Sequence, residues 1–448
     1  MPPTCTLVGA APVYSPRVIS FGEPTINAVS FRALQLNRNV RLLGVGAGVR
    51  LFGVAMVYPF LSLFFYHVAG LGYAIIGLLI LLVSSLPLAV SPFGGLVTDR
   101  YGRKRVFVAG LGGEATSVFL MAVSMQFNFV PGVLLGGSLA GVAGSTAQPA
   151  IQAYVADMAD IPERTMAYTW VRVWFNAGYT FGVLLGGVLV GFLGFAETAF
   201  TTTVIMTSGV VFLFLALDPS PYDVALSKGQ ASALHPGDAV RPGSMGDSIR
   251  ALAKDRTFLI LCLAMLLSGL VYGHWSTTFI LFSNTVLLIP YAILAVGLAL
   301  NGMIVVFGQT ATTKMMKGRK HTFSAILAVI MMGFSFIALG GISLIGGAAL
   351  VAMFSYVILL TIGENLGAIP SMTLASNVAP VSEIGNYNGV MGLFSGIGNS
   401  LSPAIGGLVL ASFSNPLVVW LILGIPCIPA IRLFRWLGTK IPAAANTV

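Results

Sequence analysis

Charge is what this sequence lacks most. Asp, Glu, Lys and Arg make up only 8% of its 448 residues, whereas hydrophobic residues make up 56%, and the mean hydropathy is +0.92. A soluble domain of this length needs a far more polar surface. Apolar runs long enough to cross a bilayer recur along the whole chain. The composition therefore excludes a soluble globular protein and predicts an integral membrane protein of many helices.

Cysteine and the residues of an enzyme site are scarce as well. The three cysteines are Cys5, Cys262 and Cys427, and two of them lie inside apolar runs, so neither a disulfide framework nor a metal cluster is indicated. The four histidines are scattered, and the sequence has no GxxxxGK[ST] loop to hold the phosphates of ATP. We therefore expect no enzyme activity, no cofactor and no bound metal.

Twelve apolar segments reach the roughly 20 residues that a helix needs to cross a bilayer. We expect the spans at 42–67, 73–96, 106–127, 131–156, 167–194, 198–217, 257–282, 287–312, 322–342, 348–376, 388–412 and 415–436. The start of the eighth span is the least distinct, because Pro290 stands close to it. The pattern predicts an all-α membrane protein with 12 transmembrane helices.

Lysine and arginine are distributed unevenly between the two sides of these spans. Nearly all of them fall in alternate loops and in the terminal segments, and only Arg50 and Arg172 fall inside apolar spans. The positive-inside rule then predicts a multi-pass protein of the cell membrane with both termini in the cytoplasm. The net charge of +9 reflects this orientation and contact with anionic lipid headgroups, and no nucleic-acid partner is expected.

One long polar stretch interrupts the series of spans. Residues 218–255 are rich in Pro, Gly, Ser and charge, and they divide the chain into six spans plus six. Residues 1–36 contain five prolines and no apolar core with a cleavage site, so we expect a flexible extension there. The predicted organisation is a cytoplasmic extension, a first six-helix bundle, a linker, a second six-helix bundle and a tail, at 1–40, 41–217, 218–255, 256–437 and 438–448.

The two halves of the chain repeat each other weakly. With an offset of 220 residues, Gly178, Gly186 and Gly187 correspond to Gly398, Gly406 and Gly407. The tripeptide GRK at 102–104 recurs at 318–320, although Asp99 has no counterpart in the second copy. Internal symmetry between two six-helix halves is typical of secondary transporters, whose substrate site lies between the halves.

The stretch GGLVTDRYGRKR, residues 94–105, carries the clearest motif. It resembles the G-x-L-A-D-R-x-G-R-K loop of the major facilitator superfamily, and six of its residues match in register: Gly95, Asp99, Arg100, Gly102, Arg103 and Lys104. The resemblance covers residues 40 to about 437. It implies two pseudo-symmetric six-helix bundles that rock about a central site, driven by ion or substrate gradients, and we expect a monomer.

The same resemblance implies roles for the charged ends of the spans. Asp157 is expected to pair with a basic residue of the motif, most simply Arg103. Asp99 is expected to meet the N-terminal end of the eleventh span, where free backbone N–H groups favour an anion. That contact would join the halves only while the cytoplasmic side is closed, so the motif together with Asp157 is the predicted gate.

A glycine pattern in span five resembles the G-x-x-x-G-P-x-x-G-G motif of the superfamily's drug–proton antiporters. Val183 replaces the motif's proline, whereas the mirrored segment in span eleven keeps a proline. Two interpretations stand side by side, an antiporter signature and plain small-residue packing between helices. The predicted packing residues are Gly178, Gly182, Gly186, Gly187, Gly398, Pro403, Gly406 and Gly407. The arginine that these antiporters carry in span four is replaced by Gly137.

Ionisable groups inside a bilayer are costly, so each is a functional candidate. Glu364 in span ten is our main candidate for carrying a proton, and a carboxylate hydrogen-bonded to a neighbouring helix is the alternative. Arg50 in span one is expected either to bind an anionic substrate or to pair with Glu114, which lies at a similar depth in span three. Glu114 is the second candidate for proton coupling, although an ion pair is the favoured interpretation.

Other polar residues are candidates for the wall of a central cavity. Tyr272, His274 and Trp275 in span seven suit an aromatic or amphipathic substrate, and His274 is also a candidate for proton coupling. The remaining candidates are Gln148, Gln152, Asn176, Asn301 and Asn365, for each of which a hydrogen bond between helices is the alternative.

The sequence thus favours a transporter of small molecules, with proton-driven export of amphipathic or drug-like compounds as the leading hypothesis. An importer or facilitator of a small metabolite is the first alternative, and Arg50 would then favour an anion. A membrane receptor or scaffold with the same fold is a weaker alternative, because the intact loop motif favours a working transport cycle.

Overall fold

The protein is entirely helical in the part that the structure describes. The computed structural model describes residues 36–160, 163–230, 255–380 and 383–448. The predicted flexible extension lies outside these residues for positions 1–35, as do residues 231–254 of the predicted linker. Apart from one isolated bridge between Lys320 and Thr447, no strand pairing occurs in the described ranges.

Twelve described helices are long and apolar enough to cross a membrane. Spans two to six of the first half are α4 (Tyr73–Val90) with η2 (Ser91–Phe93) and α5 (Gly94–Tyr101), α6 (Arg103–Gln126), α7 (Val130–Met158), α8 (Arg164–Phe192) and α9 (Phe195–Ala216). Span one is α2 (Arg38–Val57), η1 (Tyr58–Phe60) and α3 (Leu61–His67). The short helix α10 (Pro221–Ser227) follows span six.

The second half has the same order of elements. Span seven is α13 (Arg256–Tyr272), η3 (Gly273–Ser276), α14 (Thr278–Leu281) and the π-turn η4 (Phe282–Val286). The later helices are α15 (Tyr291–Met316), α16 (His321–Ile342), α17 (Ala349–Val378), α18 (Ile384–Ser412), α19 (Pro416–Gly424), α20 (Cys427–Lys440) and α21 (Ala443–Asn446), of which α19 and α20 together form span twelve.

Several predicted boundaries differ from the structure by a few residues, and two of the differences have clear local reasons. Span eight begins at Tyr291 and not at 287, because Pro290 is the N-cap of α15 and the preceding residues prolong span seven as a π-turn. The charged stretch 94–105 was expected to be a turn, but most of it is helical: α5 runs to Tyr101 and α6 starts at Arg103. Only Gly102 separates them, with a φ of +94° that a glycine adopts without strain.

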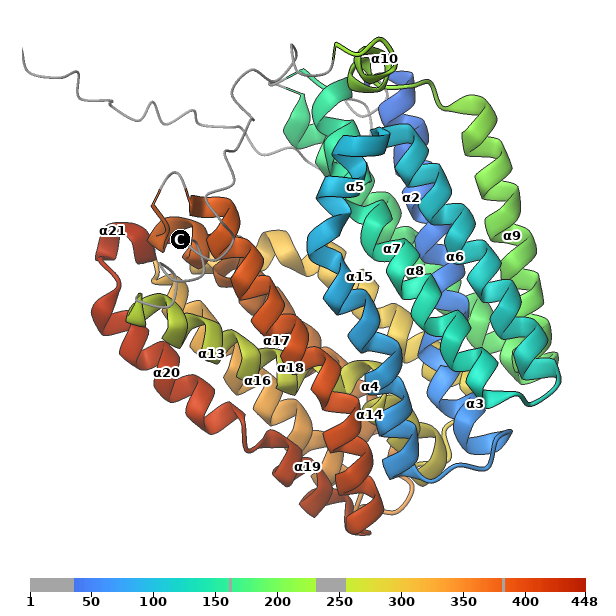
Figure 1. The fold of residues 1–448 in the computed structure, drawn as a ribbon. Coiled ribbons are helices and arrows are strands. Elements are labelled where there is room, and N and C mark those ends of the chain that lie inside the picture. The colour runs from blue at the N-terminus through green and yellow to red at the C-terminus, as the bar shows by residue number, and fades with distance from the viewer. Residues whose placement is uncertain (1–35, 161–162, 231–254, 381–382) are drawn as a thin grey trace, which may run out of the picture.

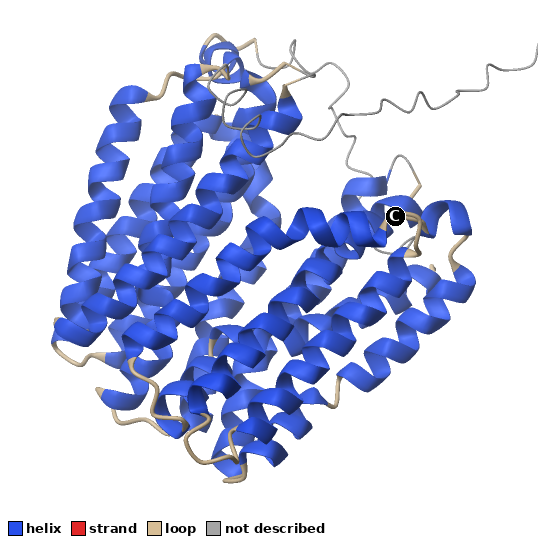
Figure 2. Cartoon of the chain, turned by 180° about the vertical axis from the view of Figure 1, so that it is seen from behind, coloured by secondary structure: helices blue, strands red, loops and turns tan. Residues whose placement is uncertain are grey.

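The helices form two bundles that diverge toward one end of the molecule (Figure 1). Within the first bundle α2 packs on α8 and α6 on α7, and within the second α13 packs on α18 and α16 on α17. The two bundles contact each other mainly through α4 against α18 and α8 against α15. We call the end that carries α10 and the C-terminal residues the linker end, and the opposite end the distal end; the view from behind shows the same divergence at the linker end (Figure 2).

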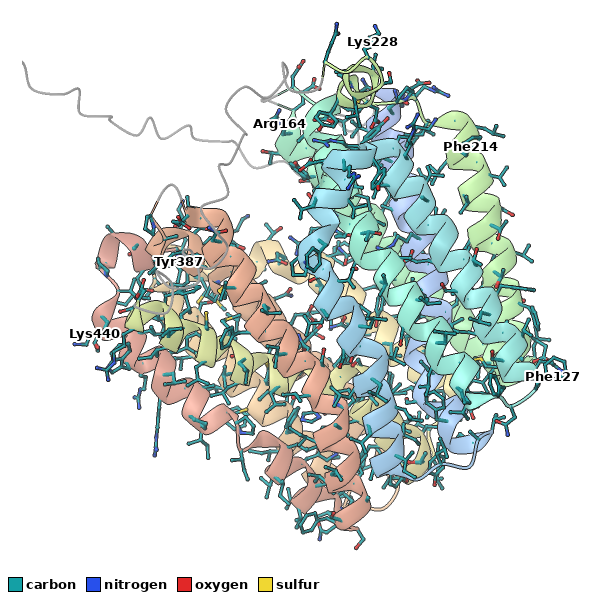
Figure 3. The ribbon with its side chains drawn as sticks, viewed as in Figure 1. Phe127, Arg164, Phe214, Lys228, Tyr387 and Lys440 are labelled. Carbon is teal, nitrogen blue, oxygen red and sulfur yellow. The ribbon has the colours of Figure 1, made fainter. Side chains whose placement is uncertain are left out.

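Side-chain contacts hold the bundles together at the distal end. The imidazole of His67 lies 2.7 Å from the amide oxygen of Asn284, and the hydroxyls of Tyr73 and Thr285 are 2.9 Å apart. Arg164 and Lys228 mark the linker end of the first bundle and Phe127 its distal end (Figure 3). On the linker side, a side chain added at Gly385, Gly389 or Gly392 of α18 would meet no atom within 4 Å. The bundles are therefore closed against each other at the distal end and apart at the linker end.

The predicted glycine faces are close helix contacts in both bundles. A Cβ on Gly178, Gly182 or Gly186 would strike a backbone carbonyl of α2, and one on Gly398 would strike a carbonyl of α13. The next position of the second stripe is Ser402, whose hydroxyl donates to the Leu270 carbonyl at 2.6 Å.

The last positions of the two stripes also face neighbouring helices. Gly406 packs on Thr278 of α14, which belongs to span seven like α13. Gly187 faces α15, and Gly407 and Pro403 face α4, so these residues pack the two bundles on each other. The packing interpretation accounts for every position of both stripes.

Candidate functional site

A cavity of about 670 Å³ lies between the two bundles. The first bundle lines it with residues of α2, η1, α3, α4, α7 and α8, and the second with residues of α13, η3, α14, α15 and α17. Its size suits a small organic molecule. Because both bundles contribute walls, any relative movement of the bundles changes its shape.

The cavity is lined where two pseudo-symmetric spans lose regular α-helical geometry. Span one turns into a 3₁₀ segment at Tyr58–Phe60, with Pro59 at its start, and span seven does so at Gly273–Ser276. Tyr58 and Pro59 on one side, and Trp275 and Ser276 on the other, face the cavity. Interrupted helices at mid-membrane are a recurrent way to build substrate sites in transporters.

Glu364 is the only carboxylate among the described residues that line the cavity. The side-chain amide of Asn301 donates a 2.8 Å hydrogen bond to it and is also 3.0 Å from the Thr361 hydroxyl. The Tyr272 hydroxyl interacts with the same carboxylate. Glu364 is thus held on the second bundle by neutral groups, with no cation in an ion pair with it among the described residues.

Aromatic rings form much of the remaining wall. Tyr58, Phe175, Tyr179, Tyr272 and Trp275 all line the cavity. Trp275 is held by a stack on Phe279, with ring centroids 5.2 Å apart. A cavity of this composition suits a flat or amphipathic molecule.

The Arg50 side chain is turned away from the cavity wall. Its guanidinium donates two hydrogen bonds of 2.7 Å to the carboxylate of Glu114, so the expected ion pair between these residues is present. Both side chains are nearly buried, with 12% and 2% exposure. Gly144 of α7 leaves room for the pair, since a Cβ there would strike both side chains. Neither residue lines the cavity, which places this pair among the contacts between α2, α6 and α7.

Four other predicted wall residues lie away from the cavity. Gln152 is exposed and Gln148 half-buried, and neither belongs to the lining. His274 is buried within the second bundle, 3.1 Å from the Thr278 hydroxyl and edge-on to Phe336. The buried amide of Asn365 donates to the Ile304 carbonyl at 3.2 Å. Helix rotation explains these positions, because neighbouring residues of a helix point about 100° apart.

The predicted wall residues that do face the cavity are Tyr272, Trp275, Asn301, Glu364 and Asn176. Tyr58, Phe175 and Tyr179 were not predicted. For Tyr179 a signal was available, since it stands three positions after Asn176 on α8 and so shares its face of the helix.

The motif residues form a compact ionic cluster at the linker end. Arg103 is 7% exposed and pairs with two acids: its Nε lies 3.1 Å from Asp157, as expected, and its Nη1 lies 2.9 Å from Asp99, which was not expected. The expected pairing of Asp157 with Arg103 is thereby confirmed. Arg100 is exposed, with its guanidinium 5.5 Å from the Tyr101 ring, and Gly95 has open space where a side chain would stand.

Asp99 itself is turned toward the open side of the cluster. Its side chain is 64% exposed, and no hydrogen bond or ion pair joins it to α18 among the described residues. The contact with the start of span eleven was expected only for a closed linker end. Because the bundles are apart at the linker end in this structure, the contact between Asp99 and α18 stays a prediction.

The first residues of the linker clamp this cluster. The Asp223 carboxylate accepts hydrogen bonds from the backbone N–H groups of Arg103, at 2.5 Å, and Lys104, at 3.2 Å, at the start of α6. Tyr222 lies over the Arg103 guanidinium at 3.4 Å and donates to the Asp99 carbonyl at 3.0 Å. This linker clamp, residues 218–227, therefore holds the motif from outside the membrane spans.

The second GRK copy is clamped in the same way by the end of the chain. Asn446 accepts a 3.0 Å hydrogen bond from the backbone N–H of Thr322, near the start of α16, and the Val448 N–H donates to the Arg319 carbonyl at 2.8 Å. Asn377, the repeat partner of Asp157, donates to the Ala445 carbonyl at 3.0 Å. Gly318 has a positive φ of +75°, as Gly102 does. We call residues 443–448 the tail clamp.

Comparison with known proteins agrees with this architecture. Residues 43–403 match the family model described as Major Facilitator Superfamily. The chain is 23% identical over 375 residues to the uncharacterized MFS-type transporter YttB of Bacillus subtilis, covering 83% of this chain and 88% of that protein. It is 26% identical over 169 residues to Multidrug resistance protein 2 of the same organism, covering 37% and 41%.

A solved structure of a POT family transporter in complex with 5-aminolevulinic acid has a similar fold. Its TM-score is 0.70 at 12% sequence identity, and the match covers 90% of this chain and 96% of that chain. At this identity the likeness concerns the fold alone.

Proposed function

The chain belongs to the Major Facilitator Superfamily, and from that premise we propose that it exports small amphipathic molecules in exchange for protons. As a secondary transporter of that superfamily it is a multi-pass membrane protein and not an enzyme. The substrate class, the direction and the coupling to protons are the parts that we propose. The observation that carries them is Glu364, the one carboxylate in the described cavity lining.

The surroundings of Glu364 suit a group that exchanges a proton. Its hydrogen-bond partners Asn301 and Tyr272 are neutral and leave the carboxylate without a fixed countercharge. When the site faces one side, a proton binds, and when it faces the other, a substrate that carries a positive charge replaces the proton. The two forms then have similar charge, so the bundles close over either one.

The open side of the structure is the side at which an exporter loads its substrate, and an importer would release its substrate from the same arrangement. The bundles are apart at the linker end, where most of the basic residues lie. By the positive-inside rule we propose that this end is cytoplasmic, so that the cavity collects molecules from the cytoplasm. Multidrug resistance protein 2 of Bacillus subtilis, which matches part of the chain, supports the same direction. The aromatic wall would bind flat, amphipathic compounds.

The proposal is tested by flux into proteoliposomes under an imposed pH gradient. A panel of neutral, cationic, anionic and zwitterionic aromatic solutes is offered, and uptake against its own gradient is measured for each. Proton antiport predicts that an outwardly directed proton gradient drives uptake of cationic members and that reversing the pH gradient reverses the flux. Symport predicts the opposite sign, and a facilitator predicts no dependence on the gradient.

The variant Glu364→Gln tests the carboxylate in coupling and in cation binding. It should abolish pH-driven uptake and weaken binding of the cationic members, because the negative charge is lost, while exchange of labelled for unlabelled neutral solute continues, because the cavity keeps its shape. The matched control is Glu197→Gln, which removes an exposed carboxylate from the first turn of α9 outside the cavity and should keep coupled flux. Persistent pH-driven uptake by Glu364→Gln would remove Glu364 from the coupling step.

A further inference from the structure

Arg172 is a cation inside a span that no acidic residue neutralises. It lies in α8, and its Nη2 donates a 2.8 Å hydrogen bond to the amide oxygen of Gln309 on α15. The described residues include no carboxylate in an ion pair with Arg172. The other arginine inside a span, Arg50, is fully engaged by Glu114. Arg172 is exposed at the open linker end, so water solvates its guanidinium there. When that end closes, a charge within a span becomes costly unless an anion accompanies it.

Helical spacing places Arg172 and Gln309 on the cavity faces of their helices. Arg172 precedes Phe175, Asn176 and Tyr179 by three, four and seven residues, and all three of these line the cavity. Gln309 follows Val305 and Gly302, which also line it, by four and seven residues. Residues at these spacings share one face of a helix. The pair therefore lies at the linker-end mouth of the cavity, one turn beyond its described lining.

The cavity then has opposite charges at two depths, contributed by opposite bundles. Arg172 is eight residues into α8, about 12 Å from the linker end, whereas Glu364 is 14 residues before the last residue of α17, or about 21 Å from it. The two side chains interact electrostatically across the space between them. Aromatic rings of Phe175, Tyr179 and Tyr272 lie among the residues of this part of the lining.

We propose that Arg172 and Gln309 form an anion-binding subsite at the mouth of the cavity, and that the transported molecules are aromatic amphoteric compounds. The protonated amine of such a compound binds Glu364, and its carboxylate or other anionic group binds Arg172. This inference rests on the proposed function and specifies its substrate class.

The chemistry of the two side chains fits an anion. A guanidinium presents parallel N–H donors to a carboxylate, and the Gln309 amide can turn its NH₂ group toward the same anion once the ligand replaces it as acceptor. A merely structural bridge between α8 and α15 would use the same hydrogen bond, but it would give no preference for one ligand charge over another.

Four matched compounds distinguish these roles. They are 4-(2-aminoethyl)benzoate, which is a zwitterion, its methyl ester, which is a cation, 4-ethylbenzoate, which is an anion, and methyl 4-ethylbenzoate, which is neutral. Binding to the full-length protein in nanodiscs is measured by the fluorescence of Trp275 and the other tryptophans. We expect the zwitterion to bind about tenfold more tightly than its methyl ester, the gain expected of one charge-assisted contact.

Variants then assign the gain to Arg172. Arg172→Gln should bind the zwitterion no better than the methyl ester while its affinity for the ester stays unchanged, and Arg172→Lys should recover part of the preference. The matched control is Arg432→Gln, which removes one positive charge from the exposed face of α20. It should keep the tenfold preference.

Three results would overturn the subsite. The first is equal affinity of the wild-type protein for the zwitterion and for its methyl ester, a result that can be observed without any variant. The second is an unchanged preference in Arg172→Gln. The third is an equal loss of affinity for all four compounds in that variant, which would mean a structural bridge.

Flux separates this inference from the proposed function. Proton-driven transport of the methyl ester without any advantage for the zwitterion would contradict the subsite alone. The expected binding pattern without proton-driven flux would contradict the proposed function alone.

Discussion

The two bundles keep a carboxylate inside the membrane in different ways. In the first, Glu114 is 2% exposed and bound by both arms of the Arg50 guanidinium. In the second, Glu364 faces the cavity and is held by Asn301 and Tyr272, which are neutral. A carboxylate with a fixed countercharge is part of the scaffold, whereas one without it responds to what enters the cavity. We propose that the two pseudo-symmetric halves divide structural and transport roles between these two carboxylates.

The two halves also use different residues to accept hydrogen bonds at the start of the helix that follows each GRK copy. Both GRK copies turn at a glycine with positive φ, and both following helices receive a hydrogen-bond acceptor from a distant segment. In the first bundle this acceptor is Asp223 of the linker clamp, and in the second it is Asn446 of the tail clamp. The charged acceptor lies in the half that carries the complete motif.

The largest effect on folding should come from separating the buried ion pair. Glu114→Gln leaves the Arg50 guanidinium buried without its countercharge and should lower the free energy of unfolding by about 3–5 kcal/mol. Glu364→Gln should change it by less than about 1 kcal/mol. The measurement is unfolding by SDS titration, followed by tryptophan fluorescence.

A double variant provides the control for that comparison. Arg50→Met with Glu114→Leu removes both charges and should recover most of the lost stability. If Glu364→Gln destabilised the protein as much as Glu114→Gln does, the proposed division between structural and transport carboxylates would be wrong.

The next largest loss of stability should come from substitutions in the glycine faces. Gly178→Ala and Gly398→Ala each push a methyl group into a backbone carbonyl, of Gly48 and Leu266 respectively, and should each cost about 1–3 kcal/mol. The matched control is Gly389→Ala on α18, where the added methyl meets nothing within 4 Å. That variant should be neutral or slightly stabilising. Equal losses at all three glycines, in the same SDS titration, would contradict the contact-based explanation.

Variants of the two clamps should lower the free energy of unfolding by smaller and unequal amounts. Asp223→Ala removes a charged acceptor from two N–H groups at the start of α6 and should cost about 1–2 kcal/mol, whereas Asn446→Ala should cost about 1 kcal/mol or less. Raising the salt concentration should reduce the first loss more than the second, because only the first has a charge. A loss in Asp223→Ala that does not depend on salt would contradict this electrostatic difference.

The smallest effect on stability, but a distinct effect on turnover, is expected at Asp99. The Asp99 side chain in the ion pair with Arg103 is mostly exposed, so Asp99→Asn should lower the free energy of unfolding by less than about 1 kcal/mol. If Asp99 meets the start of α18 when the linker end closes, as we propose, the same variant should slow transport at least several-fold. Met315→Asn, three residues before Gly318 as Asp99 is before Gly102, should transport normally. Normal turnover by Asp99→Asn would remove it from the gate.

The sequence alone predicted the twelve spans to within a few residues and the relation between the halves, and the resemblance of its loop motif implied the pairing of Asp157 with Arg103. Errors arose where local backbone chemistry intervened. Pro290 moved the start of span eight, and the motif continued a helix that had been expected to turn. Both clamps were missed, because they join segments more than 100 residues apart through hydrogen bonds that leave no pattern in the sequence.

The wall of the cavity was predicted only in part, and the arginines show why. Arg50 and Arg172 look alike in the sequence, as single cations inside apolar spans. Hydropathy and charge act along the chain, so the sequence by itself determined the membrane class, the number of spans and the motif. Only the tertiary structure decided which polar side chains meet, because a rotation of 100° per residue and the packing of neighbouring helices direct one guanidinium to Glu114 and the other to the mouth of the cavity.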